Sequence, residues 1–363
     1  MLRYRVIKQE LLDIIKKCKP LEKLPSRVTL CHRLDTSRAT LDKAIKELEA
    51  EGILFCKDGS GTYVAVPHGY DVRSSGNWGV LVPDICMEVY GSLVRGVEAV
   101  AQQHDTNLIV CNFDNSVEKY EKQIQRLMLT DVSGLIIVPV FCQDAAEVAR
   151  VNGLLCGCTK PLVVCNREVD GANIPVVMSN NFYGAYVATD HLIKKGYRRI
   201  AYMSNYNYRT SIERCNGYVG ALQGNDLPFD PSKIVMNSLG DGDDEGYAAA
   251  KRLLAEKGEV DAILCFGSLL KGVYRAAREY GYRIPEDLGI ICYDNTEVSR
   301  ELSPPVTTVE YRGYDVGYTA ANLLLQRINK VTIPEFPYYL LKPQLIERES
   351  CMGPTDIREG RKQ

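Results

Sequence analysis

The 363-residue sequence lacks the features by which several large protein classes are recognised. No apolar run reaches 18 residues, so we expect no membrane span. The charged start MLRYRVIKQELLDIIKK lacks the apolar core of a signal peptide. Hydrophobic residues make up 45% and charged residues 25%, which is typical of a folded globular protein. We therefore expect a cytoplasmic protein of two or three domains.

Motifs of catalysis and metal binding are also missing. The sequence has no phosphate-binding loop, dinucleotide-binding glycine pattern, nucleophile elbow or HExxH motif. The 13 cysteines are scattered, and the close pair Cys156 and Cys158 has one intervening residue, whereas a zinc knuckle has two. None of the four histidines is suitably placed to complete a site. We interpret the cysteines as reduced thiols and expect no metal, no cofactor and no enzymatic activity.

The chain as a whole lacks an excess of positive charge, with a net charge of −2. The distribution is uneven, however. Residues 1–67 hold 13 Lys/Arg against nine Asp/Glu, a balance of +4, so the remaining 296 residues carry −6. A small basic module joined to a larger acidic body indicates that only the module approaches a polyanion such as DNA.

The basic module has the element order of a winged helix-turn-helix. Apolar residues at helical spacing predict a helix over residues 3–18. Ser26 is placed to cap a short second helix, and Ser37 to cap a third over residues 38–51. Two strands, 53–57 and 62–66, flank a glycine-rich tip and predict a hairpin. In such a module the third helix enters the major groove of DNA.

The candidate DNA contacts lie at the starts of the second and third helices and in the hairpin. Arg38 has the fork geometry to bind a guanine, while Ser37 and Thr40 suit phosphates or bases. The glycine-rich tip offers bare amides to the phosphate backbone. The candidates are Ser26, Arg27, Ser37, Arg38, Thr40, Lys43, Lys57 and Gly59. The alternative interpretation is a small helical domain whose charged face is merely solvated.

Several motifs of this module resemble the GntR-type winged helix of bacterial regulators. They are Leu24-Pro-Ser, Ser37-Arg-Ala-Thr-Leu, the segment 44–54, and Gly59-Ser-Gly-Thr-Tyr-Val. The resemblance implies binding to operator DNA. The family usually has Glu-Arg after Leu-Pro-Ser, where this chain has Arg27-Val28, and often a basic residue where it has Asp42. Arg27 and Lys43 are the cations available to substitute, so the operator need not be the family's usual one.

A polar segment, residues 68–77, is interpreted as a linker, and the pattern then changes to alternating strands and helices over residues 78–350. Strand-like runs recur with amphipathic helical stretches between them, which predicts an α/β fold with parallel sheets flanked by helices. The number of elements favours two lobes over one sheet. Residues 351–363 are interpreted as a polar tail.

Polar and aromatic side chains follow the predicted strands. Ligands of open parallel sheets bind at the carboxyl ends of strands. Amides, a carboxylate, an arginine and aromatic rings gather there, which suits a polyhydroxylated small molecule. The candidate effector-binding residues are Tyr90, Phe141, Asn166, Arg214, Phe266 and Asp294.

This part of the chain resembles the effector domain of LacI/GalR regulators, which is similar to periplasmic sugar-binding proteins. The motifs include Gly79-Val-Leu-Val-Pro-Asp, Ser133–Pro139, Pro161–Arg167, Asn181–Tyr202, Glu213-Arg-Cys-Asn-Gly-Tyr and Arg283-Ile-Pro-Glu-Asp-Leu-Gly. The resemblance implies two lobes joined by three crossovers, a homodimer and a sugar-like effector in the cleft. Arg214 and Asp294 match residues that bind effector hydroxyls, whereas Phe266-Gly267 replaces the family's Asn-Asp.

Together these patterns predict a cytoplasmic transcription regulator. We expect a homodimeric repressor of carbohydrate-utilisation genes that binds operator DNA and responds to a sugar or sugar derivative, without contact to a membrane. A solute-binding protein without DNA binding, an activator of the same architecture and a sugar-converting enzyme are the alternatives. No catalytic constellation supports the enzyme.

Overall fold

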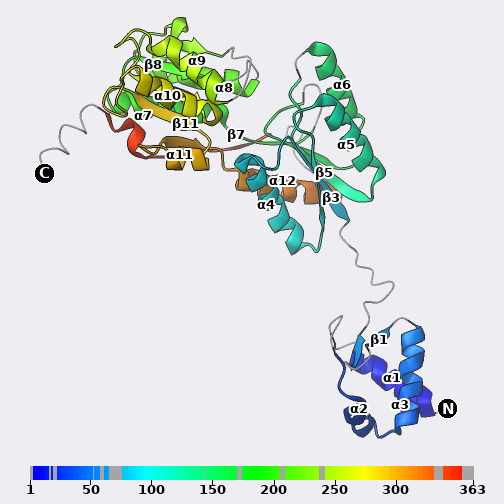
Figure 1. Cartoon of the computed structure of the whole chain (residues 1–363). Helices are drawn as coiled ribbons and strands as arrows, with labels where there is room; N and C mark the ends of the chain where they lie inside the picture. The colour runs from blue at the N-terminus through cyan, green and yellow to red at the C-terminus, as the bar shows by residue number, and fades with distance from the viewer. Residues whose placement is uncertain are drawn as a thin grey trace, which may run out of the picture. The chain divides into compact units, whose positions relative to one another are not determined.

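The computed structural model describes residues 3–15, 18, 23–51, 53–57, 61–64, 76–142, 144–169, 174–204, 209–236, 242–330 and 338–353. The predicted linker, apart from residues 76 and 77, lies outside these residues, as does the predicted tail from residue 354 onward. Contacts within the chain define two compact units, Met1–Ser74 and Ser75–Gln363. We call them the head and the body and describe each by itself (Figure 1).

The head has the predicted winged helix-turn-helix order. It consists of α1 (Arg3–Ile15), α2 (Arg27–Arg33), α3 (Arg38–Ala50), β1 (Leu54–Lys57) and β2 (Gly61–Val64). The two strands pair antiparallel. The hydroxyls of Ser26 and Ser37 cap α2 and α3 by accepting hydrogen bonds from the backbone amides three residues further on, at 3.2 and 3.3 Å. Apolar residues at helical spacing form the core, among them Leu11, Leu30, Leu41, Ile45 and Leu48.

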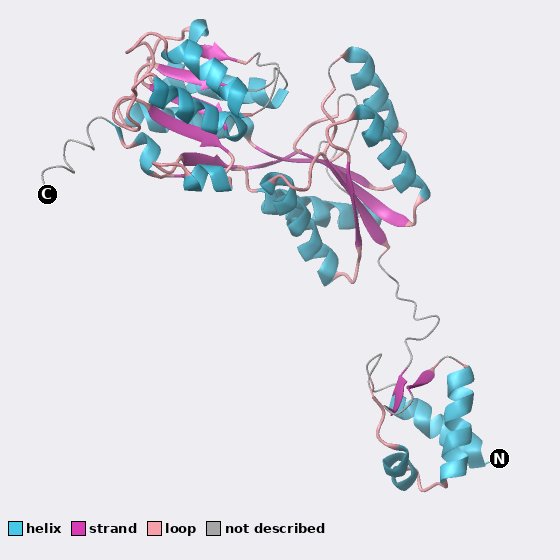
Figure 2. Ribbon diagram, viewed as in Figure 1, coloured by secondary structure: helices cyan, strands magenta, loops and turns pink. Residues whose placement is uncertain are grey.

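The body contains two six-stranded sheets, each covered by helices on both faces (Figure 2). The strand order in the first sheet is β13-β7-β6-β5-β3-β4, and all its pairs are parallel. The strands are β3 (Asn77–Val82), β4 (Leu108–Asn112), β5 (Val132–Ile137), β6 (Leu162–Cys165), β7 (Val176–Ser179) and β13 (Tyr338–Leu341). One face packs against α4 (Glu88–Gln103) and α12 (Gly313–Ile328), and the other against α5 (Val117–Leu129) and α6 (Ala145–Cys156).

The second sheet has the order β14-β12-β11-β10-β8-β9, with only β14 antiparallel. Its strands are β8 (Ile200–Met203), β9 (Ile234–Val235), β10 (Ala262–Phe266), β11 (Gly289–Tyr293), β12 (Thr307–Glu310) and β14 (Gln344–Ile346). Helices α7 (Asn181–Lys194) and α8 (Arg209–Gly224) cover one face. Helices α9 (Asp243–Leu254) and α10 (Leu270–Glu279) cover the other, and α11 (Glu297–Glu301) follows β11.

The chain passes between the two sheets three times. It leaves the first sheet after β7 and enters α7, returns between β12 and α12, and crosses again between β13 and β14. Asn180 connects the first and third passages. Its backbone N–H donates to the carbonyl of Leu341 at 2.9 Å, and its side chain caps α7. The expected two-lobed body of parallel sheets flanked by helices is therefore confirmed.

Glycines let the covering helices pack backbone to backbone. A Cβ on Gly96 of α4 would lie 2.0 Å from the carbonyl oxygen of Tyr314 on α12. A Cβ on Gly217 of α8 would lie 2.1 Å from the carbonyl oxygen of Phe182 on α7. Because backbone cannot yield as a flexible side chain does, these helix pairs depend on glycine. The α4–α12 pair matters for the site, since both helices begin beside the second passage between the lobes.

Several elements differ from the predicted boundaries. Helices α6 and α11 and the strands β9, β12, β13 and β14 are additional to the predicted elements. The helices predicted over residues 91–104, 184–195 and 212–223 each begin three residues earlier, at Glu88, Asn181 and Arg209. The additional strands are two to four residues long and, except for β12, occupy the edge positions of their sheets. Short edge strands carry little hydrophobic periodicity, which explains why the sequence pattern did not reveal them.

Candidate functional site

The head carries a groove of about 590 Å³ between α2 and the start of α3. It is lined by Arg27, Val28, Cys31, His32, Asp35, Thr36, Ser37, Arg38 and Thr40. Four predicted DNA contacts, Arg27, Ser37, Arg38 and Thr40, therefore lie on one concave surface. The side chain of Arg38 is 75% exposed, so its guanidinium group is accessible from outside. That of Arg27 is 41% exposed, but its Nε is buried.

Two pairs of hydroxyl groups at the starts of α2 and α3 are already engaged within the head, whereas the buried hydroxyl of Thr36 in the groove lining has no hydrogen-bond partner within the described residues. The Ser26 hydroxyl lies 2.8 Å from that of Thr29, and the Ser37 hydroxyl lies 2.8 Å from that of Thr40. These pairs accompany the N-cap bonds of α2 and α3. A hydroxyl that caps a helix retains acceptor capacity and can still meet a phosphate or a base edge.

The remaining DNA candidates are not part of the groove lining. Lys43 places its ammonium group 4.4 Å from the ring centre of Tyr4 on α1, a cation–π contact within the head. The side chain of Lys57 and all of Gly59 lie outside the described residues, so their predicted contacts to phosphates stay predictions.

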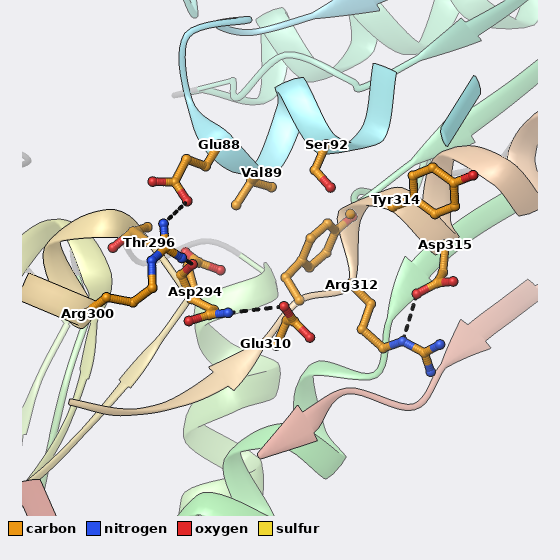
Figure 3. Close-up of a pocket in the computed structure, with 13 residues that line it drawn as sticks. Glu88, Val89, Ser92, Asp294, Thr296, Arg300, Glu310, Arg312, Tyr314 and Asp315 are labelled. Atoms are coloured by element: carbon orange, nitrogen blue, oxygen red, sulfur yellow. Dashed lines mark hydrogen bonds and ion pairs between the residues drawn. The ribbon is translucent and has the colours of Figure 1, made fainter. Parts of the chain in front are cut away.

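In the body, a cavity of about 290 Å³ lies where the second passage crosses between the lobes (Figure 3). Glu88, Val89 and Ser92 come from the start of α4 in the first lobe, and Asp294, Asn295, Thr296 and Arg300 from the region after β11 in the second. The remaining lining residues, 310–315, form the passage itself. The cavity is therefore built from both lobes.

Asp294 is the candidate effector residue in this cavity. It directly follows β11 with a left-handed backbone (φ 71°), and its amide N–H donates to the carbonyl of Val309 at 3.0 Å. Burial raises the pKa of its carboxyl group, and the nearby Arg214 guanidinium partly opposes that rise. Within the described residues, no group donates a hydrogen bond to the carboxylate, so hydroxyl donors of a ligand would stabilise its charged form.

Arg214 lies in the second lobe and is only 5% exposed. Its Nε donates to Oδ1 of Asn181 at 3.0 Å, and its guanidinium carbon lies 4.5 Å from the ring centre of Phe266 and 3.8 Å from that of Tyr293. Two flanking rings and one amide hold the guanidinium plane in a fixed orientation. The Phe266 ring, predicted to face a sugar, packs on Arg214 and Tyr293 and does not line the cavity that contains Asp294.

Phe141 and Asn166 line a second cavity of about 190 Å³, together with residues of α6 and the start of α8. Asn166 follows β6 with a left-handed backbone (φ 68°), and its buried Oδ1 has no hydrogen-bond partner within the described residues. Nη1 of Arg167 donates to the carbonyl of Pro139 at 2.6 Å, which fixes the cavity's cationic wall. Tyr90, in contrast, lies in the core of the first lobe and lines neither cavity.

Two ion pairs join the lobes at this site, and sequence reasoning missed both. Nη2 of Arg300 lies 3.3 Å from Glu88, whose carboxylate also accepts the backbone N–H of Glu297 at 2.7 Å. Arg209, at the start of α8, lies 2.5 Å from Glu168, which follows β6. Their partners are 212 and 41 residues apart in the sequence, and no local pattern links residues at such separations.

Neither a cluster of metal ligands nor a membrane-spanning helix occurs in the described part of the chain. Among the residues with described positions, no group of three or more His, Cys, Asp or Glu side chains is arranged to hold a metal ion. No helix in the described ranges is both long and apolar enough to cross a membrane.

Both units match known protein families. Residues 3–64 match the gntR family of bacterial regulatory proteins, and residues 189–351 match a periplasmic binding protein-like domain. The arabinose metabolism transcriptional repressor of Geobacillus stearothermophilus is 25% identical over 353 residues, which is 96% of this chain and 97% of that protein. The ribose operon repressor of Halalkalibacterium halodurans is 31% identical over 286 residues, covering 77% of this chain and 81% of that repressor.

Solved structures share the fold of the body. A LacI family transcriptional regulator from Enterococcus faecium, with bound ribose, superimposes with a TM-score of 0.63 at 27% sequence identity. The match covers 77% of this chain and 99% of the regulator. The relatives named here are described as transcription regulators, and two of them as repressors of sugar genes.

Proposed function

Because the chain belongs to the LacI-type family of bacterial transcription regulators, here with a GntR-type head, we propose that it is a homodimeric repressor of carbohydrate-utilisation genes. In this proposal the head binds operator DNA in the cytoplasm, a sugar-like effector binds between the lobes of the body, and the chain catalyses no reaction. The observation that carries the proposal is the combination, in one chain, of an accessible Arg38 on a capped recognition helix with a two-lobed body.

The proposed DNA interface is the groove between α2 and α3. Arg38 stands at the N-terminal end of the recognition helix, the end that contacts base edges in helix-turn-helix proteins. Ser26, Ser37 and Thr40 surround the entry to the groove and are proposed to meet phosphates. Two heads of a homodimer would bind two half-sites, so the proposal predicts an operator with approximate two-fold symmetry.

The proposed effector site includes the cavity that contains Asp294 and the neighbouring Arg214. The Asp294 carboxylate, which receives no hydrogen bond from the described residues, offers an acceptor to a sugar hydroxyl. The Arg214 guanidinium, held between two rings, offers donors to adjacent hydroxyls. Asn166 and Phe141 are proposed to complete the site from the first lobe. The ribose bound to the Enterococcus regulator supports a sugar as the ligand class.

The proposed coupling acts through the interface between the lobes. A ligand that binds better when the lobes are closed shifts the population toward that state. The Glu88–Arg300 and Glu168–Arg209 pairs lie at this interface and would rearrange on closure. A coupling free energy of about 1–3 kcal/mol between effector and operator is enough for a useful switch.

A thermal-shift screen of the full chain against pentoses, hexoses, disaccharides and uronates tests the effector class. A sugar with a micromolar Kd, supplied at millimolar concentration, would stabilise the protein by about 4 kcal/mol through mass action. The same screen on Arg214→Ala is the control, because a genuine ligand of the cleft must lose its stabilising effect there. If no member of the four classes shifts the melting temperature of the wild-type chain, a sugar effector is ruled out.

A further inference from the structure

The recognition helix carries an acidic side chain where the head would face negatively charged DNA. Asp42 lies on α3 one turn after Arg38, and its side chain is 37% exposed. An isolated carboxylate in this position would repel the phosphate backbone and weaken binding to any DNA sequence. The presence of this partly exposed carboxylate on the recognition helix therefore calls for a physical explanation.

Asp42 is bracketed by the two arginines of the groove. Its Oδ1 lies 2.9 Å from Nε of Arg27, which begins α2, and its Oδ2 lies 3.9 Å from Nε of Arg38. Nη2 of Arg27 in turn donates to the sulfur of Cys56 on β1 at 3.6 Å. Arg27 thus links α2, α3 and the wing, and it lies beside Oδ1 of Asp42, the carboxylate oxygen other than the one that Arg38 approaches.

Arg38 is constrained from one edge only. The carboxylate of Asp42 faces the Nε edge of its guanidinium, and no other partner of this side chain is found in the described part of the head. The two terminal nitrogens consequently stay available on the outer edge. Two parallel N–H donors are the arrangement that binds O6 and N7 of a guanine in the major groove.

We propose that Asp42 is a positioning residue that holds Arg38 in the orientation that reads one guanine of each operator half-site. The proposal rests on the proposed function of the head and deepens it by assigning its base specificity. Asp42 contributes selectivity at the expense of general DNA affinity, because the same charge that orients Arg38 repels phosphates. Arg27 acts as the anchor of Asp42 rather than as a second reader of bases.

The proposal is tested by selecting binding sites for the full chain from a random double-stranded DNA library. The wild type is expected to enrich half-sites with one invariant guanine, and Arg38→Ala is expected to lose that preference. Asp42→Asn keeps the shape of the side chain and removes its charge. It should lower the preference for guanine at that single position by about tenfold, with binding to random-sequence DNA unchanged or tighter.

Glu47→Gln is the matched control, because it removes one acidic charge from the same helix at the ion pair with Lys8, outside the groove lining. It should leave the base preference as in the wild type. Circular dichroism melts of each variant establish that the head remains folded.

Three outcomes would overturn the proposal, and they differ from failure of the function itself. If Asp42 did no more than repel the DNA phosphates, Asp42→Asn would bind all sequences more tightly with an unchanged preference for guanine. If Asp42 itself contacted a base, Asp42→Asn would lose a base preference that Arg38→Ala retains. A fall in binding to every sequence by the same factor would make Asp42 a purely structural residue. If the wild-type chain enriches no sequence at all, the proposed function of the head fails together with this inference.

Discussion

The head and the body expose their key arginines in opposite ways. Arg38 of the head is 75% exposed, and its Nε lies 3.9 Å from the carboxylate of Asp42. Arg214 of the body is 5% exposed, lies between two rings and donates to Asn181. DNA is larger than the head and can be met only at its surface, whereas a small molecule can be enclosed. The exposure of each arginine thus matches the size of the ligand proposed for it.

This difference has an energetic consequence. Exposed charges are screened by salt over about 10 Å at 0.1 M ionic strength, while buried charges are screened much less. Exposed side chains can also be replaced at little cost in stability, whereas a buried guanidinium is part of the packing around it. The two units should therefore respond differently to salt, to truncation of an arginine and to pH.

Ionic strength should separate the two units most strongly. If the dimer neutralises about six phosphates, raising salt from 50 to 200 mM should weaken operator binding by roughly a thousandfold. Binding of a neutral sugar in the body should change little over the same range. Fluorescence anisotropy with labelled duplex and calorimetry with the sugar measure the two affinities. Equal salt dependence of both would contradict the contrast between an exposed and a buried site.

Arg214→Ala should have the largest effect among substitutions. Removing the guanidinium from between the Phe266 and Tyr293 rings leaves a void and deprives the side-chain oxygen of Asn181 of its donor. The expected cost is about 3 kcal/mol in the free energy of unfolding. The sugar-induced thermal shift should disappear as well. Arg214→Lys is the control that keeps the charge but not the planar stacking. A normal response to effector in Arg214→Ala would remove this residue from the proposed site.

Arg38→Ala should affect the head alone. Loss of a bidentate contact to guanine is expected to weaken operator binding by about 2 kcal/mol, or roughly thirtyfold. The melting temperature and the sugar-induced shift should be unchanged, since the side chain is 75% exposed and its ion pair with Asp42 is 3.9 Å long. Gel-shift titrations and thermal melts on the same preparation check both statements. Unaltered operator binding would show that α3 is not the reading helix.

Of the three substitutions, Asp294→Asn should produce the smallest change in free energy. It should stabilise the folded protein, whereas Arg214→Ala destabilises it. Because burial raises the pKa of Asp294 in the folded protein, the folded state binds more protons than the unfolded state between the ordinary and the raised value. The contribution of Asp294 to stability is thus lost as pH rises through the raised pKa, and its charged form costs stability at neutral pH. The variant should melt a few degrees higher than the wild type at pH 7.

The gain from Asp294→Asn should shrink as pH falls below the ordinary pKa of an aspartate, where both side chains are neutral. The variant should also bind the sugar more weakly, because the buried charge that lowers stability is the one proposed to bind the ligand. Melting curves from pH 3.5 to 7.5 test the sign. A variant that is less stable than the wild type at neutral pH would show that Asp294 is stabilised by its surroundings.

The sequence predicted those features that depend on local pattern. Ser26 and Ser37 were identified as N-caps because capping requires a particular residue type immediately before a helix. Continuous apolar runs over residues 162–165, 200–203 and 262–266 indicate buried strands, and they coincide with β6, β8 and β10. The number of predicted elements favours two lobes, and the family resemblance adds the three passages between them, which periodicity alone does not give.

Features that depend on tertiary contact could not be predicted from the sequence. The orientation of Arg214 depends on Asn181 and Tyr293, which are 33 residues before it and 79 residues after it. The positions of Phe266 and Tyr90 in the sequence make them candidates for the cleft, yet both rings pack into the core of the protein. The direction of a side chain at the end of a strand is set by its neighbours in three dimensions, and composition does not reveal it.

The central claim is that one chain couples a ligand in the body to DNA at the head, and thermodynamic reciprocity tests it most directly. The duplex enriched by the wild-type chain is titrated with and without the sugar that gives the largest thermal shift, and the sugar is titrated with and without the duplex. The account predicts that each ligand changes the affinity of the other by the same factor, between about five- and 150-fold. Independent affinities in the wild-type dimer would contradict it.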